Sequence, residues 1–229
     1  MTLRHKRLVL YAGALVVLAA LLGPVPHSAR QMVWDFEADQ PGLIAVGFAS
    51  ESGRWEVALE GENRVLAQRA ENRAEIFNVA LLDDTSYRDV DVSVRMKAVA
   101  GENEGGGGLL WRAKDKDNYY VSRYNPFVAR HNPRRPSFRL YKVENGRCTQ
   151  LDHADAPGET PGKTRSEAPT ATEWHTLRIT MIGREIIGYL DGQKLLEADD
   201  ATFLDVGRIG LWTKSDARSY FDDLTVSGP

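Results

Sequence analysis

The chain has very little cysteine: Cys148 is alone among 229 residues. A single cysteine cannot form an internal disulfide, so the fold must be stabilised by its hydrophobic core. Cys148 also lies far from the apolar N-terminal run, which argues against a lipid-anchored N-terminal cysteine. We expect it to be a half-buried small side chain and not a reactive thiol.

Excess basic charge is also lacking. The chain contains 29 Lys and Arg against 32 Asp and Glu. Residues 1–29 hold three of the basic residues and no acidic one, so residues 30–229 carry 26 against 32, a net charge of −6. Because a basic surface is the first requirement for binding nucleic acid, we expect no nucleic-acid partner.

One apolar run stands out, at residues 8–22, after the basic residues Arg4, Lys6 and Arg7. This layout, followed by Gly23 to Ala29, is typical of a secretory signal peptide. An uncleaved membrane anchor is the alternative, because the run is close to the shortest that spans a bilayer. Both interpretations predict an exported protein, periplasmic or extracellular, with membrane association through residues 8–22 in the second.

Helical periodicity is almost absent after residue 30, while short alternating segments bounded by turn residues recur. They predict an all-β fold, a two-sheet antiparallel β-sandwich of jelly-roll type, built by residues 30–229 as a single domain. Two stretches rich in Pro and polar residues, 125–137 and 157–172, are predicted loops. The predicted strands are 33–37, 55–59, 64–68, 77–81, 90–97, 109–113, 118–124, 138–143, 175–181, 186–190, 194–197, 208–212 and 220–226.

Two segments predict details of this β-sandwich. Residues 90–97 alternate strictly, so Val90, Val92, Val94 and Met96 are expected to face the core. Asp191-Gly192 is the favoured pair for a tight hairpin turn between two strands.

The usual catalytic motifs are missing. There is no zinc-ligand spacing of His and Glu, no Gly-x-Ser-x-Gly turn and no Cys–His nucleophile signature. The glycine run 105–108 is not followed by the Lys-Ser or Lys-Thr of a phosphate-binding loop, so we interpret it as a turn. The string of alternating carboxylates that glucanases carry on one strand is also absent.

Several segments, taken in order, resemble a known group of domains. They are Asn118 to Asn125, Phe138 to Val143, Trp174 to Arg178, Tyr189 to Gly192 and Gly210 to Asp216. Their order resembles secreted bacterial domains of the concanavalin A-like lectin and glucanase superfamily, in particular laminin-G-like and 3-keto-disaccharide-hydrolase-type domains. The resemblance runs from about Trp34 to the C-terminus and implies contact with carbohydrate.

The candidate ligand site is a sheet face built from 118–125, 138–143 and 210–216. If Val121 and Leu140 face the core, their neighbours face a ligand, where aromatic rings stack on sugars and Arg or Asn binds hydroxyl groups. We expect Tyr120 and Trp212 to be stacking platforms. The polar partners are then Arg123, Asn125 and Arg139, with Tyr141 beside them and Lys214 and Asp216 at the rim. Ordinary solvated strand faces are the alternative.

A second candidate site joins the two ends of the domain. Terminal strands of β-sandwiches are often neighbours, so Asp35 and Glu37 are expected near Asp222 and Asp223. No cofactor is required, but the oxygens of Asp35, Glu37 and Asp222 suit a structural Ca²⁺ ion. Asp223 is expected on the face opposite Asp222. Solvated charges of an edge strand are the alternative.

The sequence therefore predicts an exported, lectin-like carbohydrate-binding domain without catalysis. A glycoside hydrolase that uses Asp216 or Asp222 is the first alternative. A structural envelope or adhesion domain is the second.

Overall fold

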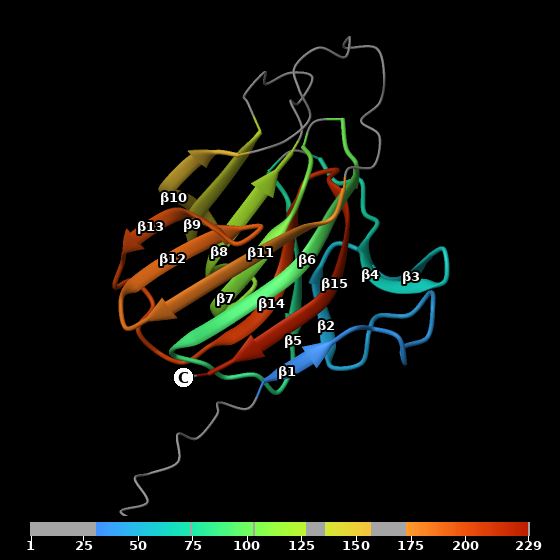
Figure 1. Ribbon diagram of the computed structural model, residues 1–229, viewed down its shortest axis with the longest axis horizontal. Helices are drawn as coiled ribbons and strands as arrows, with labels where there is room; N and C mark the ends of the chain where they lie inside the picture. The colour runs from blue at the N-terminus through green and yellow to red at the C-terminus, as the bar shows by residue number, and fades with distance from the viewer. Residues whose placement is uncertain (1–30, 74, 103, 127–135, 157–172, 229) are drawn as a thin grey trace, which may run out of the picture.

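The computed structural model describes residues 31–73, 75–102, 104–126, 136–156 and 173–228, so the predicted leader and most of the two predicted loops lie outside the described residues. The described residues form strands joined by turns (Figure 1). None of them forms a helix with the length and apolarity that a membrane crossing requires. The strands are β1 Met32–Trp34, β2 Phe48–Ser52, β3 Trp55–Glu60, β4 Asn63–Gln68, β5 Phe77–Leu82, β6 Val90–Ala100, β7 Gly108–Asp115, β8 Asn118–Asn125, β9 Ser137–Glu144, β10 Arg147–Asp155, β11 His175–Ile182, β12 Glu185–Leu190, β13 Gln193–Asp199, β14 Arg208–Lys214 and β15 Arg218–Ser227.

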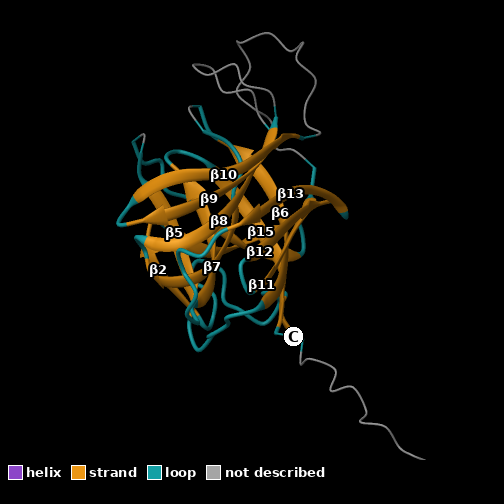
Figure 2. Ribbon diagram, turned by 90° about the vertical axis from the view of Figure 1, so that its left-hand side faces the viewer, coloured by secondary structure: helices purple, strands orange, loops and turns teal. Residues whose placement is uncertain are grey.

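These strands build two antiparallel sheets that pack face to face (Figure 2). The eight-stranded sheet has the order β13-β12-β11-β6-β15-β4-β3, with β1 paired to β15. The seven-stranded sheet has the order β10-β9-β8-β7-β14-β5-β2. The predicted all-β sandwich of jelly-roll type is therefore confirmed.

The main core lies between the sheets. Val90, Val92, Val94 and Met96 face inward from β6 and are almost completely buried, as their alternation predicts. They pack against residues of β7, β8 and β14 such as Trp111. Burying large side chains of this kind stabilises the fold by about 1.5–3 kcal/mol each.

The hairpin and the pairing of the chain ends are both as expected. Asp191 and Gly192 have positive φ angles of 49° and 81°, which a type I′ turn requires, and Leu190 pairs with Gln193 across them. β1 pairs with the last strand, with Trp34 opposite Leu224. Two strands escaped the sequence prediction, β2 and β10. Both lie at edges of the seven-stranded sheet and are largely polar, so neither shows an apolar run.

Candidate functional site

The seven-stranded sheet buries side chains on both of its faces. On the face turned away from the other sheet, which we call the outer face, a second apolar cluster lies across β5, β7, β8, β9 and β14. Tyr141 and Phe77 are half-buried and pack against it. The cluster comprises Val79, Leu81, Leu110, Ala113, Tyr119, Val121, Val143 and Trp212.

A hydrogen bond shows how closely side chains meet on this face. The indole Nε1 of Trp212 on β14 donates to the hydroxyl of Tyr119 on β8 at 3.1 Å, although β7 lies between these strands. Gly108 of β7 is the register partner of Trp212. A Cβ there would lie 1.6 Å from the carbonyl oxygen of Ser122, so only glycine fits at this position.

A network of charges borders this cluster at one end of the sandwich, and we call it the rim network. Arg123 of β8 pairs with Glu104, and Lys214 of β14 pairs with the same carboxylate at 3.2 Å and with Glu75 at 3.4 Å. Asp216 accepts hydrogen bonds from the backbone N–H groups of Glu102 and Glu104, at 2.8 and 3.1 Å. Asp216 therefore positions the segment that carries Glu104.

A second arginine stands directly opposite the first. Arg139 of β9 is the register partner of Arg123, and alternation along the strands places both on the outer face. Arg139 donates to Ser137 Oγ at 3.1 Å and to Gln150 Oε1 at 3.2 Å. Two guanidinium groups on neighbouring strands supply fixed, planar sets of donors for hydroxyl or carboxylate oxygens. Alternation also places Asn125, the register partner of Ser137, at this end of the face.

Cys148 belongs to the same face, although we expected a half-buried structural residue. It is exposed on β10 and is the register partner of Val143. Desolvation nevertheless raises the pKa of its thiol, while the charges of Lys214 and Arg123 act to lower it. Cys148 therefore lies on the outer face close enough to Lys214 and Arg123 for their charges to act on its thiol.

Tyr120 is not part of this face, which corrects the predicted stacking platform. Its ring is completely buried between the sheets, and Val121 takes the outward position in its place. The Tyr120 hydroxyl donates to Asp200 Oδ1 at 2.6 Å and accepts from the N–H of Phe203 at 3.1 Å. Burial and the contact with Asp200 raise the pKa of Tyr120 to about 12.

Trp212 needs a similar correction. It lies on the predicted face, but its ring is only 2% exposed and packs against Phe77 with 5.3 Å between ring centroids. A ring covered on this scale cannot stack on a sugar. Of the eight predicted ligand residues, the structure brings Arg123, Asn125, Arg139, Tyr141, Trp212, Lys214 and Asp216 to the outer face or its end, and Tyr120 to the core.

The Asp200 carboxylate makes the stability of the fold depend on pH. Burial alone would raise its pKa, but hydrogen bonds from Thr202, Tyr120 and Lys142 outweigh this and lower the pKa from 3.8 to about 2. A lowered pKa stabilises the fold above pH 4, and the contribution is lost as pH falls from about 4 to about 2.

We therefore expect Asp200→Asn to cost on the order of 2 kcal/mol at neutral pH and almost nothing near pH 2. Urea denaturation of both proteins across this pH range measures the difference. A difference that stays constant with pH would contradict the role of the Asp200 charge.

The three carboxylates of the predicted calcium site have separate partners. Asp35 accepts from the N–H of Glu37 at 3.2 Å, and Glu37 accepts from the N–H of Arg64 at 2.8 Å. Asp222 is buried on the eight-stranded sheet, where it accepts from Asn63 at 3.0 Å and lies 3.6 Å from Arg95. The described residues contain no group of three or more His, Cys, Asp or Glu side chains spaced to hold a metal ion. These carboxylates do not fit a shared Ca²⁺ site.

Asp222 and Asp223 also differ from expectation. A register irregularity follows Asp222, and Asp223 has a positive φ of 49°. Both carboxylates consequently reach Arg95, Asp223 at 3.1 Å, instead of pointing to opposite faces. Burial raises the pKa of Asp222, against the hydrogen bond from Asn63.

The two antiparallel sheets packed face to face define a β-sandwich domain of the jelly-roll class. A family described as the 3-keto-alpha-glucoside-1,2-lyase-like domain matches residues 51–227, and the chain belongs to this family. The resemblance inferred from the sequence is thus confirmed. A comparison with curated proteins finds no match.

Solved structures with the same fold include three that are informative. The carbohydrate-binding module CBM66 from Bacillus subtilis has a TM-score of 0.62 and 21% identity, over 80% of this chain and 96% of that one. The carbohydrate recognition domain of Emp47p has a TM-score of 0.56 and 10% identity, over 86% and 95%. The lumenal domain of VIP36, in a form bound to Ca²⁺ and Man3GlcNAc, has a TM-score of 0.54 and 12% identity, over 80% and 82%.

Proposed function

We propose that the protein binds saccharides on the outer face of the seven-stranded sheet. The observation that carries this proposal is the rim network: Arg123 and Lys214 share Glu104 on the face where the half-buried rings of Tyr141 and Phe77 pack against the buried cluster. A saccharide presents hydroxyl groups at its edge, which the charged side chains can bind, and C–H groups on its ring faces, which the half-buried ring of Tyr141 can contact. The similar folds of carbohydrate-binding proteins support the proposal.

Within this proposal, Arg123 and Arg139 hold oxygens of the ligand, and Lys214 and Glu104 complete the polar edge. Tyr141, which is half-buried on β9, supplies the ring nearest to them on the same face. Trp212 and Tyr119 support the surface from beneath. Asp216 acts through Glu104 because it binds that segment's backbone.

A glycan array probed with the full chain tests the proposal. We expect saturable binding that Arg123→Ala weakens roughly 10- to 100-fold, because a hydrogen bond to a charged group contributes about 1.5–3 kcal/mol. Arg178→Ala is the matched control: Arg178 also forms an ion pair, with Asp91 at 2.6 Å, but it belongs to the eight-stranded sheet.

The array is read with calcium and with a chelator, so that a requirement for Ca²⁺ becomes visible. Equal loss in Arg123→Ala and Arg178→Ala, or no retained glycan under either condition, would contradict saccharide binding on this face. The second result leaves a structural envelope or adhesion domain as the better function.

Cleavage of the bound saccharide is the alternative function, and the family name, which includes a lyase, favours testing it. The predicted acids do not form a pair. Asp216 is committed to two backbone N–H groups at the end of β14, and Asp222 is buried on the other sheet. Incubating the retained glycans with the chain and analysing the products distinguishes a lectin-like domain from an enzyme.

We further propose that the domain works outside the cytoplasm, in the periplasm or extracellular space. The basic and apolar pattern of residues 1–29 supports this, as a cleaved signal peptide or as an anchor through residues 8–22.

A further inference from the structure

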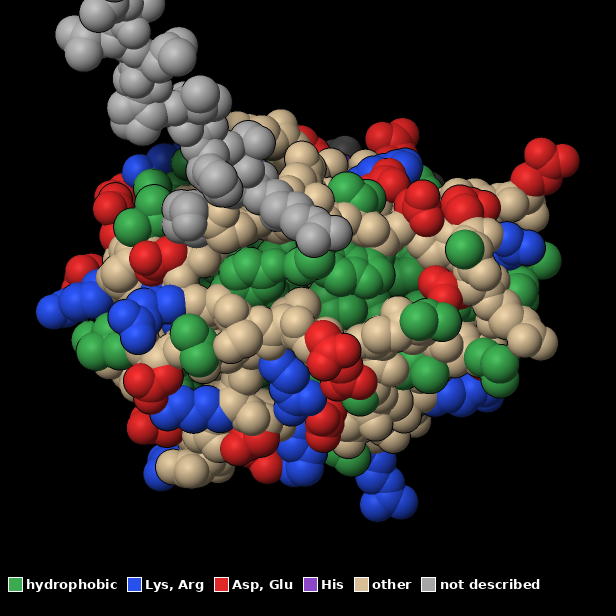
Figure 3. Space-filling model, turned by 90° about the horizontal axis from the view of Figure 1, so that it is seen from below, with side chains coloured by type: hydrophobic (Ala, Val, Ile, Leu, Met, Phe, Trp, Pro, Cys, Tyr) green, Lys and Arg blue, Asp and Glu red, His purple; other side chains and the backbone are tan. Residues whose placement is uncertain are grey.

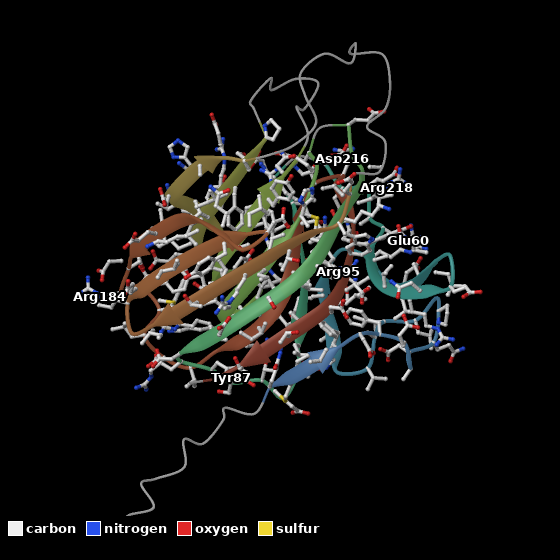
Figure 4. All side chains as sticks on the ribbon, in the orientation of Figure 1. Glu60, Tyr87, Arg95, Arg184, Asp216 and Arg218 are labelled. Atoms are coloured by element: carbon white, nitrogen blue, oxygen red, sulfur yellow. The ribbon has the colours of Figure 1, made fainter. Side chains whose placement is uncertain are left out.

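Several loops meet at the end of the sandwich opposite the rim network. Tyr87 and Gly207 exchange two backbone hydrogen bonds of 3.0 Å, and the N–H of Asp83 donates to the carbonyl of Gly47 at 2.7 Å. Gly228 packs against Tyr87, so the last described residue lies here as well. Figure 4 shows Tyr87 at this end and Asp216 at the other. We call it the apolar end.

Buried Arg112 ties three of these loops together. Its guanidinium donates to the carbonyl oxygens of Arg88, Phe203 and Gly183, at 2.6, 2.8 and 2.7 Å. The three loops are therefore held in fixed positions relative to one another. The side chains exposed at their tips consequently form a surface of fixed shape.

That surface is unusually apolar. Among the described residues, eight large hydrophobic side chains are exposed, and five of them lie at this end, each between 50% and 80% exposed. Seen from this end, hydrophobic side chains line a recess between the two layers, with charged residues around it (Figure 3). Concentrated apolar exposure of this kind marks a surface that contacts a partner. The five residues are Val33, Val46, Ile182, Leu204 and Val206.

The position at which β1 begins indicates which partner this surface contacts. Met32 begins β1 opposite Val226, so the chain enters the domain at the apolar end (Figure 1). Residues 23–31 separate the apolar run 8–22 from β1, and nine residues reach about 30 Å at most. The rim network lies at the other end of β6, whose 11 residues extend about 33 Å, so it is that much farther from the start of β1.

Several charges around this end form pairs. Arg184 pairs with Asp199, Lys114 pairs with Asp205 at 3.7 Å, and Arg208 pairs with Asp83 at 3.5 Å. Paired charges give no net attraction to acidic lipids. Contact with a bilayer at this end consequently depends on the apolar side chains and not on the headgroup charge.

We propose that residues 8–22 stay in the membrane and that the apolar end rests on the lipid bilayer, with Val46 and Val206 in contact with it. The rim network then faces away from the membrane, toward the space that holds soluble or surface-bound ligands. The apolar end thus sets the orientation of the domain relative to the membrane, while residues 8–22 tether it there.

Depth-dependent quenching in vesicles tests this orientation. The full chain, with Cys148→Ser to remove the exposed native thiol, is reconstituted into phosphatidylcholine vesicles. An environment-sensitive dye is attached at Val46→Cys, at Val206→Cys or, as the control, at Ile76→Cys, which is exposed next to β5 on the rim side. Spin-labelled lipid is then added as the quencher.

We expect the dye at residues 46 and 206 to lose most of its emission and the dye at residue 76 to keep it. Adding Leu204→Asp to the Val206→Cys chain should restore the emission while the chain still floats with the vesicles. Three outcomes would overturn the proposal: no quenching at residues 46 and 206, equal quenching at all three positions, or a processed chain that lacks residues 8–22 and stays in solution. None of these outcomes depends on whether the chain binds saccharides.

Discussion

Replacing Arg112 by methionine is expected to lower the free energy of unfolding by about 3–5 kcal/mol, the cost of removing one side of a buried charged network. The Arg112 side chain is 1% exposed, and its donors satisfy carbonyl groups of three separate loops. Methionine fills a similar volume but leaves those carbonyl oxygens buried without donors. Burial lowers the pKa of Arg112, yet the guanidinium remains charged at neutral pH.

Urea denaturation monitored by tryptophan fluorescence measures this loss, and for a domain of this size the melting temperature should fall by roughly 6–20 °C. Arg178→Met is the matched control, since Arg178 forms an exposed ion pair worth about 1 kcal/mol or less. If Arg112→Met does not fold, Arg112→Lys keeps the charge but loses the fork of donors, and it should still be clearly destabilised. A loss no larger than that of Arg178→Met would contradict the structural role of Arg112.

Trp212→Ala is expected to act on stability first, by about 3–5 kcal/mol, because it empties a site buried on the outer face. The substitution also removes the donor that the Tyr119 hydroxyl accepts from, and burial of this hydroxyl already raises its pKa. Tyr119→Phe deletes the same hydrogen bond without a cavity and should cost only about 1 kcal/mol.

Denaturation curves for the two variants separate packing from hydrogen bonding. A ring that only stacked on a sugar would leave the unfolding free energy almost unchanged when removed. Finding Trp212→Ala as stable as the parent protein, with saccharide binding abolished, would restore the stacking role and contradict its burial. For the same reason, loss of binding in Trp212→Ala is not by itself proof of contact with a ligand, and Arg123→Ala is the better probe.

The direction in which β8 faces could not be derived from the sequence. Val121 lies between Tyr120 and Ser122, and alternation alone places either the valine or its neighbours inward. Alternation identifies the core face only when the other face is solvated, whereas β7, β8 and β14 bury both faces. β6 has a half-exposed outer face, and its inward residues were predicted correctly.

The sequence also could not predict which residues from distant strands would form ion pairs with one another. Glu104, Arg123 and Lys214 lie on separate segments of the chain, and no spacing in the sequence links them. The convergence of Asp222 and Asp223 on Arg95 depends on a local irregularity of β15 that no residue pattern announces. The exposed position of Cys148 was not predicted for a related reason: β10 is a polar edge strand without apolar alternation.

The sequence by itself determined the fold class, most strands, the Asp191-Gly192 turn and the family, because these depend on local propensity, periodicity and the order of short segments. It also placed seven of the eight predicted ligand residues on strands of the seven-stranded sheet. Only the tertiary structure decided which of them are accessible, that Tyr120 and Trp212 are covered, and that charged residues from distant segments meet at one end of the outer face. Burial and charge pairing depend on which strands become neighbours, and in an antiparallel sandwich those neighbours are far apart in the chain.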